Sequence, residues 1–518
     1  MPESAFKIAV VGSGPSGLSA AARAAQLGLS HVLLEAEPHL SNTIFRYQKG
    51  KHVMAEPSVL PLRSPLPFEA GRREQILGAW AHGASGLKLN LRLTSPVQGI
   101  TGTRGDFTLT LTDGSSLRAE FIVLAIGLQG NIRKLGCPGE DLPYVQYQLD
   151  DPDEYQDESI VIVGAGDAGI ENALALAGHN KVTILNRDSE FTRAKEANNA
   201  AILKCIEKGE MQCVYSSSIV KVEELDGRPR QRATLKTANG DVQLDCDRII
   251  ARLGAMPPRK FVESCGIEFP SKDPNSVPAV SPRYESNVPG LYVIGALAGF
   301  PLIKQAMNQG YEVIEFIQGN PVEPADTPLL RQKFSAVPQW GDVDAAVAYI
   351  QQHVPVLSPL TPLQIREFLL DSEVRAPASG TMIFQRNDYT NSFFSIVEGT
   401  VEVELKPGDP TRTIRLGAGD FFGEMGLISG RRRSATVRAG ADCVLIETPR
   451  RSMNKLIHSV AEVKRVLDQT FMLRAIQTQI APGVASDVLD VWWPPPGSST
   501  SSLATCCSSR VSPATACT

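Results

Sequence analysis

The stretch KIAVVGSGPSG, residues 7–17, decides the fold of this chain. Its apolar residues 8–11 predict a buried parallel strand, and Gly12, Gly14 and Gly17 follow in the spacing G-x-G-x-x-G. Such a turn lets a pyrophosphate approach the backbone, and the positive end of the next helix favours the phosphate charge. The sequence therefore predicts a dinucleotide site here. The alternative is a glycine turn in another kind of α/β unit.

The residues after this turn complete a strand–helix–strand unit. A helix of small residues is followed by a second strand, His31 to Leu34, which leads into Glu35. An acidic residue at this place accepts hydrogen bonds from the hydroxyl groups of a ribose. The segment 36–70 is long and rich in proline, so we expect it to line or cover the site. Within it, Phe45 and Tyr47 either face the cofactor or belong to a local core.

The same pattern returns later in the chain. An apolar strand, Ser159 to Val163, runs into GAGDAG, residues 164–169, with the same glycine spacing. The second strand of this unit, Val182 to Leu185, ends in Asn186 and Arg187. A basic residue at this position suits the 2′-phosphate of NADPH, whereas an acidic residue suits a free ribose. We therefore assign FAD to the first unit and NADPH to the second.

The glycine turn and the bases after the second strand supply the predicted contacts of NADPH. These contacts are Gly164, Gly166, Asp167, Ala168, Gly169, Arg187 and Arg193. Arg193 and Lys195 lie close to Arg187 in the sequence, and they either extend the phosphate site or form a solvated charged surface. Arg187 has the better position, because it comes almost directly after the strand.

A return segment, GLYVIGALAG at residues 290–299, follows the second unit. It predicts a strand at Leu291 to Ile294, and a helix follows from Ile303 to Ile317. We interpret both as the completion of the first domain, with the second domain inserted in it. The predicted fold class is an α/β flavoprotein with two three-layer, Rossmann-like dinucleotide-binding domains. We expect the FAD-binding domain at 1–150 and 275–318 and the NADPH-binding domain at 151–274.

Residues 5–318 resemble the thioredoxin-reductase-like pyridine nucleotide-disulfide oxidoreductases. The resemblance rests on the motifs GSGPSG, VLAIG, NIRKLGCPGED, VGAGDAGIENAL, VTILNRDSEF and GLYVIGALAG. It implies FAD on the first unit, NADPH on the second, and a helix start at Lys304 that contacts the flavin and favours negative charge on its ring. The expected flavin contacts are Gly12, Gly14, Pro15, Ser16, Gly17, Glu35, Gly127, Gly295, Ala296, Lys304, Gln305 and Ala306.

The chain departs from thioredoxin reductases in its cysteines. Those proteins carry a C-x-x-C dithiol before the second glycine turn, whereas this chain reads YVQYQLDDPDEYQDES at 144–159 and has no C-x-x-C anywhere. In this it resembles the dithiol-less branch, which includes thioredoxin-reductase-like ferredoxin–NADP reductases and bacillithiol-disulfide-reductase-like proteins. The latter carry a cysteine in the first glycine loop, where this chain has Ser16. We interpret Cys137 as a small buried hydrophobe.

A second departure is Ala296, which replaces the aspartate that contacts the flavin ribitol in the family. This replacement lowers the expected affinity for FAD without removing the site.

The rest of the chain, residues 319–518, has a different composition. Residues 319–345 contain several prolines and no clear period, so we expect a linker. A short helix, Thr361 to Leu370, is followed by short strands with glycine turns, the pattern of a small antiparallel β-roll. We assign residues 346–478 to this domain. The tail at 479–518 is rich in Ser, Thr and Pro and is expected to be disordered.

The stretch FFGEMGLISGRRRSATVRA, residues 421–439, is the most informative part of this domain. Gly423 lets the backbone approach a phosphate, and Arg433 can form charge-assisted hydrogen bonds with a phosphodiester. The stretch resembles the phosphate-binding cassette of cyclic nucleotide-binding domains. The resemblance implies that Glu424 takes the ribose 2′-hydroxyl, Arg433 the cyclic phosphate, and Ser434 a further contact. The alternative is a domain of this fold with an unused pocket.

Composition sets outer limits on the function. The chain has 518 residues, enough for about three or more domains, and its net charge of −5 provides no basic footprint for nucleic acid. No apolar run is long enough to span a membrane, and the first strand begins too early for a signal peptide. The nine scattered cysteines favour a reducing cytosol and argue against zinc or iron–sulfur sites. We expect a cytoplasmic homodimer with no metal site and no nucleic-acid or membrane partner.

Together these inferences predict an NADPH-dependent FAD oxidoreductase with a regulatory site for cAMP or cGMP. The acceptor of its electrons is a ferredoxin-like protein, a disulfide or another molecule that the sequence does not identify. Because the redox chemistry belongs to the cofactors, we assign no side-chain acid, base or nucleophile. The alternatives are a low-molecular-weight disulfide reductase, a redox sensor without turnover, and a cyclic-nucleotide-responsive transcription factor. The last needs a helix-turn-helix after the β-roll, and the tail shows no such pattern.

Overall fold

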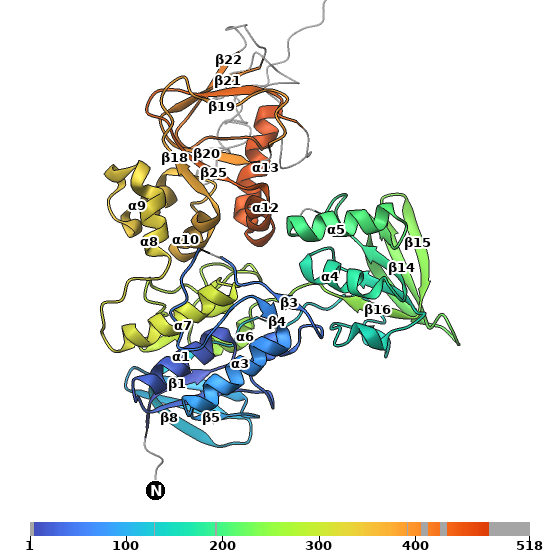
Figure 1. The fold of residues 1–518 in the computed structure, drawn as a ribbon, viewed down its shortest axis with the longest axis vertical. Helices are drawn as coiled ribbons and strands as arrows, with labels where there is room; N and C mark the ends of the chain where they lie inside the picture. The colour runs from blue at the N-terminus through green and yellow to red at the C-terminus, as the bar shows by residue number, and fades with distance from the viewer. Residues whose placement is uncertain are drawn as a thin grey trace, which may run out of the picture.

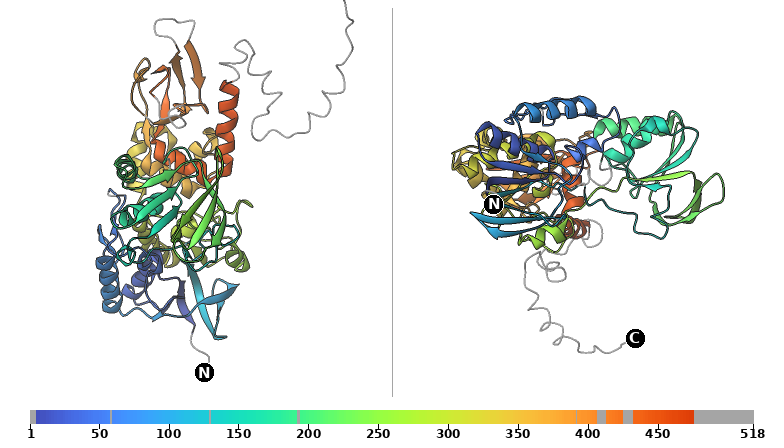
Figure 2. Two further views of the ribbon diagram at one scale, coloured as in Figure 1. Left: turned by 90° about the vertical axis from the view of Figure 1, so that its right-hand side faces the viewer. Right: turned by 90° about the horizontal axis from the view of Figure 1, so that it is seen from below.

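The computed structural model describes residues 5–475, apart from 58, 129, 192–193, 391, 406–412 and 425–431. These residues form three bodies, each built on its own sheets (Figure 1). The first domain lies at the bottom of that view, the second at the right and the C-terminal domain at the top, and the view from below in Figure 2 shows the second domain to one side of the first. Within the described ranges, no helix has both the length and the apolar character needed to cross a lipid bilayer.

The first domain is organised around a sheet with the strand order β5-β2-β1-β8-β7-β6, and β17 also pairs with β8. Its strands are β1 (Phe6–Val11), β2 (His31–Leu34), β5 (Leu91–Arg92), β6 (Val97–Thr103), β7 (Asp106–Leu111), β8 (Ser116–Leu124) and β17 (Leu291–Val293). The pairs of β1 with β2 and β8, of β2 with β5 and of β8 with β17 are parallel. Residues 8–10 of β1 are fully buried, because helices cover both faces of a parallel sheet.

The helices of the first domain come from two parts of the chain, one before and one after the second domain. They are α1 (Pro15–Gln26), α2 (Asn42–Phe45), α3 (Arg73–Gly86), α6 (Arg259–Ser264) and α7 (Ile303–Ile317), with a 3-10 turn at Gly295–Ala298 and a small ribbon of β3 (His52–Val53) and β4 (Gly71–Arg72). Helices α1 and α7 pack so closely that a Cβ atom on Gly310 would lie 2.2 Å from the carbonyl oxygen of Ser16. The Ser19 hydroxyl also donates to the Met307 carbonyl at 2.6 Å. The chain therefore returns to the first domain after the second, as the sequence predicts.

The second domain repeats this plan on a parallel sheet with the order β12-β11-β10-β16-β9. Its strands are β9 (Val145–Gln146), β10 (Ser159–Val163), β11 (Lys181–Leu185), β12 (Gln212–Val214) and β16 (Arg248–Ala251). An antiparallel sheet is formed by β13 (Ser218–Glu224), β14 (Gln231–Thr237) and β15 (Gly240–Cys246). The helices are α4 (Asp167–Leu176) and α5 (Glu196–Glu207), after a 3-10 turn at Pro152–Glu154.

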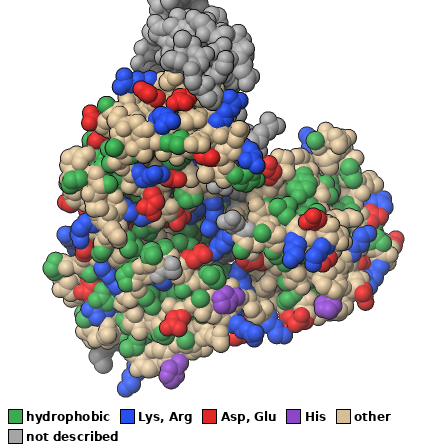
Figure 3. Space-filling model, turned by 45° about the horizontal axis from the view of Figure 1, so that its top comes forward, with side chains coloured by type: hydrophobic (Ala, Val, Ile, Leu, Met, Phe, Trp, Pro, Cys, Tyr) green, Lys and Arg blue, Asp and Glu red, His purple; other side chains and the backbone are tan. Residues whose placement is uncertain are grey.

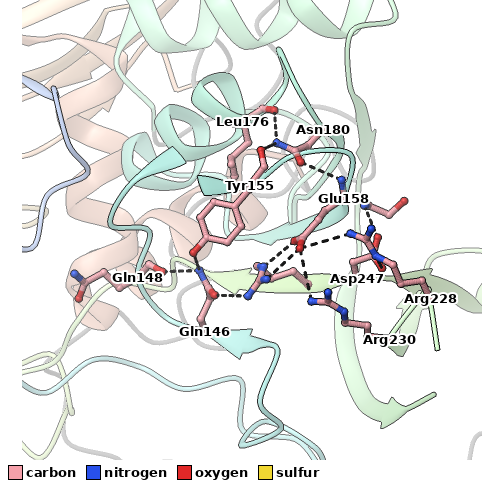
Figure 4. Close-up of polar contacts among 11 residues, drawn as sticks. Gln146, Gln148, Tyr155, Glu158, Leu176, Asn180, Arg228, Arg230 and Asp247 are labelled. Carbon is pink, nitrogen blue, oxygen red and sulfur yellow. Dashed lines mark hydrogen bonds and ion pairs between the residues drawn. The ribbon is translucent and has the colours of Figure 1, made fainter. Parts of the chain in front are cut away.

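A partly buried ion-pair network holds the amino-terminal edge of this second sheet together (Figure 4). The buried carboxylate of Glu158 accepts hydrogen bonds from Arg248, at 2.9 Å from Nε and 3.2 Å from Nη2. Arg228 and Arg230 form further ion pairs with Glu158 at 3.7 and 3.6 Å. Glu158 immediately precedes β10, at the end opposite the glycine turn, so the network stabilises the sheet and is not part of the cofactor site.

The C-terminal domain is a β-roll of two antiparallel sheets, with the orders β18-β25-β20-β23 and β19-β24-β21-β22. Its strands are β18 (Glu373–Arg375), β19 (Met382–Phe384), β20 (Phe393–Glu398), β21 (Thr400–Glu404), β22 (Thr413–Gly417), β23 (Phe421–Phe422), β24 (Thr436–Ala439) and β25 (Val444–Thr448). The helices α12 (Arg450–Ser459) and α13 (Ala461–Ala475) follow the roll. The tail that the sequence predicts to be disordered, residues 479–518, lies outside the described residues.

The segment 319–345 differs from the linker that the sequence predicts. It contains α8 (Thr327–Lys333), 3-10 turns at Phe334–Ala336 and Pro338–Trp340, and the start of α9 (Val343–His353). Leu330 and Trp340 are buried in the core of the C-terminal domain. Pro328 and Pro338 lie in the first turns of their elements, where the missing N–H has no intrahelical partner to lose, so they begin these elements and do not break them.

Helix α10 (Pro362–Asp371) joins the C-terminal domain to the first domain. Its Leu363 belongs to the buried core of the first domain, whereas Phe368 and Leu369 belong to the core of the C-terminal domain. Two faces of one helix are thus buried in two different cores. Figure 3 shows the surface of all three domains from above, where Lys and Arg side chains are interspersed with Asp and Glu.

Candidate functional site

A first cavity, of about 450 Å³, lies at the carboxyl end of β1. The residues that line it include many of the predicted flavin contacts, namely Gly12, Gly14, Pro15, Ser16, Glu35, Gly127, Ala296 and Ala306. The N-terminal turn of α1 also lines the cavity, since its N-cap is Gly14 and its first residues are Pro15 and Ser16. This end of a helix presents free N–H groups and a positive dipole to an anion.

The glycines of the first turn are required by close backbone packing. Gly12 has φ +99°, and a Cβ atom there would lie 2.7 Å from the carbonyl oxygen of Ala125. A Cβ atom on Gly17 would lie 1.9 Å from the Gly12 oxygen. Gly295 meets the same turn from the return segment, because its Cβ position is 2.6 Å from Ser16 Oγ. Gly17 and Gly295 thus shape the wall of the cavity through packing.

Glu35 is held in place by the glycine turn itself. The residue is 7% exposed, and its carboxylate accepts hydrogen bonds from Ser13 N at 2.8 Å, from Ser13 Oγ at 2.5 Å and from Glu37 N at 3.0 Å. A carboxylate has about four acceptor positions, so one position remains for a hydroxyl group in the cavity. This geometry suits the ribose contact that the sequence predicts, and it adds Ser13, which the sequence analysis missed.

Only some of the residues at the start of α7 line the first cavity. Ala306 lines the cavity, whereas Lys304 Nζ donates to the carbonyl of Pro57 at 2.9 Å, and burial lowers the pKa of this lysine. Gln305 lines a separate cavity of about 360 Å³ beside Glu312. The structure therefore does not bring Lys304 and Gln305 to the first cavity with the other predicted contacts.

The structure distinguishes the two alternatives for Phe45 and Tyr47 in the long segment 36–70. Tyr47 lines the first cavity, and burial raises the pKa of its hydroxyl. Phe45 is 41% exposed and stacks on His39, with ring centroids 3.6 Å apart. The segment lines the site as expected, through Tyr47 and through Ile44 of α2.

A second cavity, of about 550 Å³, lies at the carboxyl end of β10. Its lining includes the predicted residues Gly164, Gly166, Asp167, Ala168 and Arg187. Gly169 is needed for packing, because a Cβ atom there would lie 1.9 Å from the Gly164 oxygen. Arg193 lies outside the described residues. Lys195 is engaged elsewhere: its Nζ pairs with Glu56 of the first domain at 2.8 Å.

The second cavity contains further basic residues that sequence reasoning missed. Arg133, Lys134 and Arg252 line it together with Arg187. Arg252 directly follows β16, and its Nη1 donates to the carbonyl of Tyr147 at 2.7 Å. Its Nε is buried without a hydrogen-bond partner among the described residues, and burial lowers its pKa. The rule that selected Arg187, a base after a parallel strand, applies equally to Arg252 in the stretch DRIIARLG.

The C-terminal candidate residues lie together, but Arg433 faces the protein. Gly423 has φ +85°, and its Cβ position is 2.8 Å from Arg433 Nη1, so only glycine fits beside this side chain. Arg433 is 5% exposed; it donates to the Ser392 carbonyl at 2.7 Å and to Thr390 Oγ1 at 2.8 Å. Its guanidinium lies 4.2 Å from the ring centroid of Phe384.

The rest of the predicted cassette is only partly described. Glu424 and Ser434 are described, and Ser434 is exposed, whereas residues 425–431 lie outside the described residues. A phosphate at this place must therefore compete with protein acceptors for the guanidinium of Arg433.

The cysteines give no sign of a redox pair. Those of the described chain are free thiols, and burial raises the pKa of Cys137, which disfavours the reactive thiolate. Within that part of the chain there is also no group of His, Cys, Asp and Glu suited to a metal ion.

Two glycine turns, each at the carboxyl end of a parallel strand and each beside a cavity, define a protein with two dinucleotide sites. Residues 9–295, more than half of the chain, match the profile of the pyridine nucleotide-disulphide oxidoreductases, and the chain belongs to this family. Membership implies a flavin and NAD(P)H as cofactors. Residues 375–460 match the cyclic nucleotide-binding domain, so the chain combines an oxidoreductase with a domain of that kind.

The relatives match the oxidoreductase part. A ferredoxin–NADP reductase of Ignicoccus hospitalis is 26% identical over 58% of this chain and 93% of its own length. Bacilliredoxin reductase Bdr of Bacillus subtilis is 23% identical over 56% of this chain and 90% of its own length.

Solved structures show the same fold. Bacillithiol disulfide reductase Bdr from Staphylococcus aureus has a TM-score of 0.56 at 21% identity, covering 62% of this chain and 99% of that one. Thioredoxin reductase from Lactococcus lactis has a TM-score of 0.51 at 20% identity, covering 61% and 98%. The predicted fold class is confirmed.

Proposed function

We propose that this protein is an NADPH-dependent FAD oxidoreductase whose turnover is regulated by a cyclic nucleotide bound to the C-terminal domain. The observation that carries the proposal is the pair of glycine-bounded cavities on one chain, one next to the acid Glu35 and one next to the base Arg187. An acid suits a free ribose and a base suits a 2′-phosphate, so the two cavities differ in the cofactor that they accept.

The first cavity supplies what FAD binding needs. The N–H groups at the start of α1 receive the pyrophosphate, Glu35 accepts from the ribose, and Ser13 fixes the Glu35 carboxylate for that purpose. FAD, when bound, supplies the hydride-accepting ring and passes electrons onward. The residues of this chain position and enclose the cofactor, and none of them needs to act as a nucleophile.

The second cavity supplies charge for a cofactor with an extra phosphate. Arg187 is exposed and lines this cavity, so a 2′-phosphate can approach its guanidinium. Arg133 and Arg252 add positive charge in the same cavity. These residues favour NADPH over NADH through charge-assisted hydrogen bonds.

The absence of C-x-x-C separates this chain from dithiol exchange with thioredoxin. Related proteins are named as ferredoxin–NADP reductases and as a bacilliredoxin reductase, so the family admits acceptors of more than one kind. We expect no NADPH-dependent reduction of thioredoxin. Thioredoxin reduction that disappears in Cys137→Ser would overturn this expectation.

The deciding experiment is anaerobic reduction of the purified protein with NADPH and with NADH. The protein should be yellow, and NADPH should bleach the flavin absorbance at a lower concentration than NADH. Arg187→Ala should raise the half-saturating concentration of NADPH about tenfold or more and that of NADH little, because one charge-assisted contact contributes roughly 1.5–3 kcal/mol. Lys181→Ala, at the opposite end of β11, is the matched control. Protein that stays colourless with added FAD, or equal effects of Arg187→Ala on both nucleotides, would contradict the proposal.

A further inference from the structure

A third cavity, of about 250 Å³, lies between the first domain and the C-terminal domain. The first domain contributes loop residues such as Val277, Gly299 and Pro301 to its wall. The C-terminal domain contributes α10 and α12, which lie where the two domains meet in Figure 1. The two walls touch, since the Cβ position of Gly299 is 3.8 Å from Gln364 Cγ of α10. The cavity is therefore complete only when both domains are present.

The third cavity adjoins the first cavity. Leu128, Ala296 and Pro301 line both of them. Ala296 lies in the 3-10 turn Gly295–Ala298 of the return segment, where the two cavities share a wall. A small molecule in the third cavity thus lies beside the first cavity, on the side that the C-terminal domain covers.

The charged groups that line the third cavity are paired with one another or with neutral groups. Glu367 of α10 forms an ion pair with Lys455 of α12 at 2.9 Å. Asp371 accepts a hydrogen bond from the hydroxyl of Ser452 at 3.0 Å. The remaining wall is mainly apolar, with Val277, Phe368, Leu456 and Val460 among its residues. Such a lining favours an uncharged guest with an apolar body, because a charged guest would be desolvated without a free counter-charge.

We propose that the third cavity binds the electron acceptor, and that this acceptor is a small uncharged quinone. The proposal rests on the proposed function and names its oxidant. In the overall reaction NADPH gives a hydride and solvent gives a proton. The quinone gains two electrons and two protons and leaves as the hydroquinone, and NADP⁺ is released. Drug-sized ligands occupy pockets of about 300–1,000 Å³, so a cavity of 250 Å³ accepts a smaller molecule of one or two rings.

Other acceptor classes suit this cavity less well. A ferredoxin is much larger than the cavity, and α10 and α12 occupy the side from which it would reach the shared wall at Ala296. A disulfide with charged carboxylates would find Lys455 already paired with Glu367. A quinone carries no charge, so the apolar part of the wall can contact its rings without a free counter-charge.

Titration of the oxidised holoenzyme with menadione, a two-ring quinone, tests the proposal without turnover. No NADPH is added, so calorimetry reports binding alone. Ser452→Trp fills the cavity from α12, and Ala255→Phe fills it from the segment between β16 and α6. Each should weaken menadione binding by at least tenfold. Arg451→Trp places the same ring on the exposed neighbour of Ser452 outside the cavity and should leave binding unchanged.

The outcomes distinguish this inference from the function on which it rests. Failure of wild-type protein to bind menadione, or equal binding by wild type and both cavity-filling variants, would overturn the quinone site. Anaerobic reduction of the flavin by NADPH is measured in the same variants and should stay within twofold of wild type. If wild-type flavin is not reduced by NADPH, the proposed function fails by itself, whatever the menadione titration shows.

Discussion

Arg450, the first residue of α12, donates a hydrogen bond from Nη2 to the carboxylate of Glu190 at 3.3 Å. Glu190 lies in the loop after β11 and lines the second cavity together with Arg187. The C-terminal domain thus contacts the rim of the proposed NADPH site as well as the wall of the third cavity. The contact follows β25 directly in sequence, and β25 pairs with β20 beside Ser392, the acceptor of Arg433. One strand therefore lies between the predicted phosphate-binding cassette and a contact with the second domain.

The first prediction concerns this interdomain pair. Arg450→Glu should change the half-saturating concentration of NADPH by about twofold. It should also reduce any change that a cyclic nucleotide causes in that concentration. The expected change is small because the pair is partly exposed, and such pairs contribute about 0–1 kcal/mol. The reversed pair, Arg450→Glu with Glu190→Arg, should restore the wild-type response. Single and double variants that behave alike would show that the contact carries no coupling.

The second prediction concerns the acid of the first cavity. Glu35→Gln removes the charge that Ser13 N and Ser13 Oγ bind, so the affinity for FAD should fall about tenfold or more, as expected for lost charge-assisted hydrogen bonds. The affinity is measured by diluting the holoprotein and recording the fluorescence of the FAD that dissociates. Glu69→Gln changes an exposed carboxylate outside the cavity and serves as the control. Retention of FAD equal to wild type in Glu35→Gln would remove Glu35 from the site.

The sequence predicts those parts of the fold that depend on local periodicity. The strand at 8–11, the turn at Gly12, helix α1, strand β2 and Glu35 follow in the predicted order, and the second unit repeats this order up to Arg187. Here the short apolar runs, the glycines that tolerate positive φ and the residue after the strand all indicate the same unit.

The features that the sequence does not predict depend on tertiary contacts. The prolines of 319–345 suggest a linker, yet Trp340 is buried only because α9 and the β-roll pack against that segment. The sequence of α10 does not show that Leu363 packs in the core of the first domain, because other apolar residues of the same helix pack in the core of the C-terminal domain. Gln305 and Ala306 are neighbours, but the helical turn directs them to different cavities.

The third prediction concerns a buried carboxyl group on α7. Glu312 is 1% exposed and accepts hydrogen bonds from Tyr284 Oη at 2.6 Å and from Ala325 N at 2.7 Å. Burial raises the pKa of Glu312 to about 7 from its ordinary value of 4.5. Between these values the folded state holds a proton that the unfolded state has lost. Stability should therefore fall as the pH rises from 5 to 7, by up to about 3 kcal/mol from this group.

Thermal unfolding of wild type and Glu312→Gln at pH 5, 6, 7 and 8 tests this sign. The difference in Tm between the two proteins should move in favour of Glu312→Gln as the pH rises, because the amide has no proton to lose. Glu268→Gln, an exposed carboxylate of the same domain, should show no such trend. A Tm difference that is constant with pH would contradict the raised pKa of Glu312.

The last prediction concerns the cyclic nucleotide. We expect wild-type protein to bind cAMP or cGMP in calorimetry, with a change in NADPH oxidation of several-fold, as coupling free energies of roughly 1–3 kcal/mol produce. Arg433→Ala should abolish binding, but it also removes the hydrogen bonds to Ser392 and Thr390 and should lower Tm. Glu424→Gln is the sharper variant, because it removes the charge of a half-buried side chain and keeps its shape. It should weaken binding by about tenfold without loss of Tm.

Arg432→Ala is the matched control for this prediction. Arg432 is exposed next to Arg433, and its Nη1 donates to the Asn387 carbonyl at 3.0 Å. The Arg432→Ala protein should bind cyclic nucleotide with an affinity within twofold of wild type. If Arg433→Ala and Glu424→Gln both bind as tightly as wild type, the cassette assignment is wrong, and the inward contacts of Arg433 are its only role. If wild type binds but NADPH oxidation is unchanged with every acceptor, the domain binds the nucleotide without control of turnover, since a ligand shifts an equilibrium only by its differential affinity for the two states.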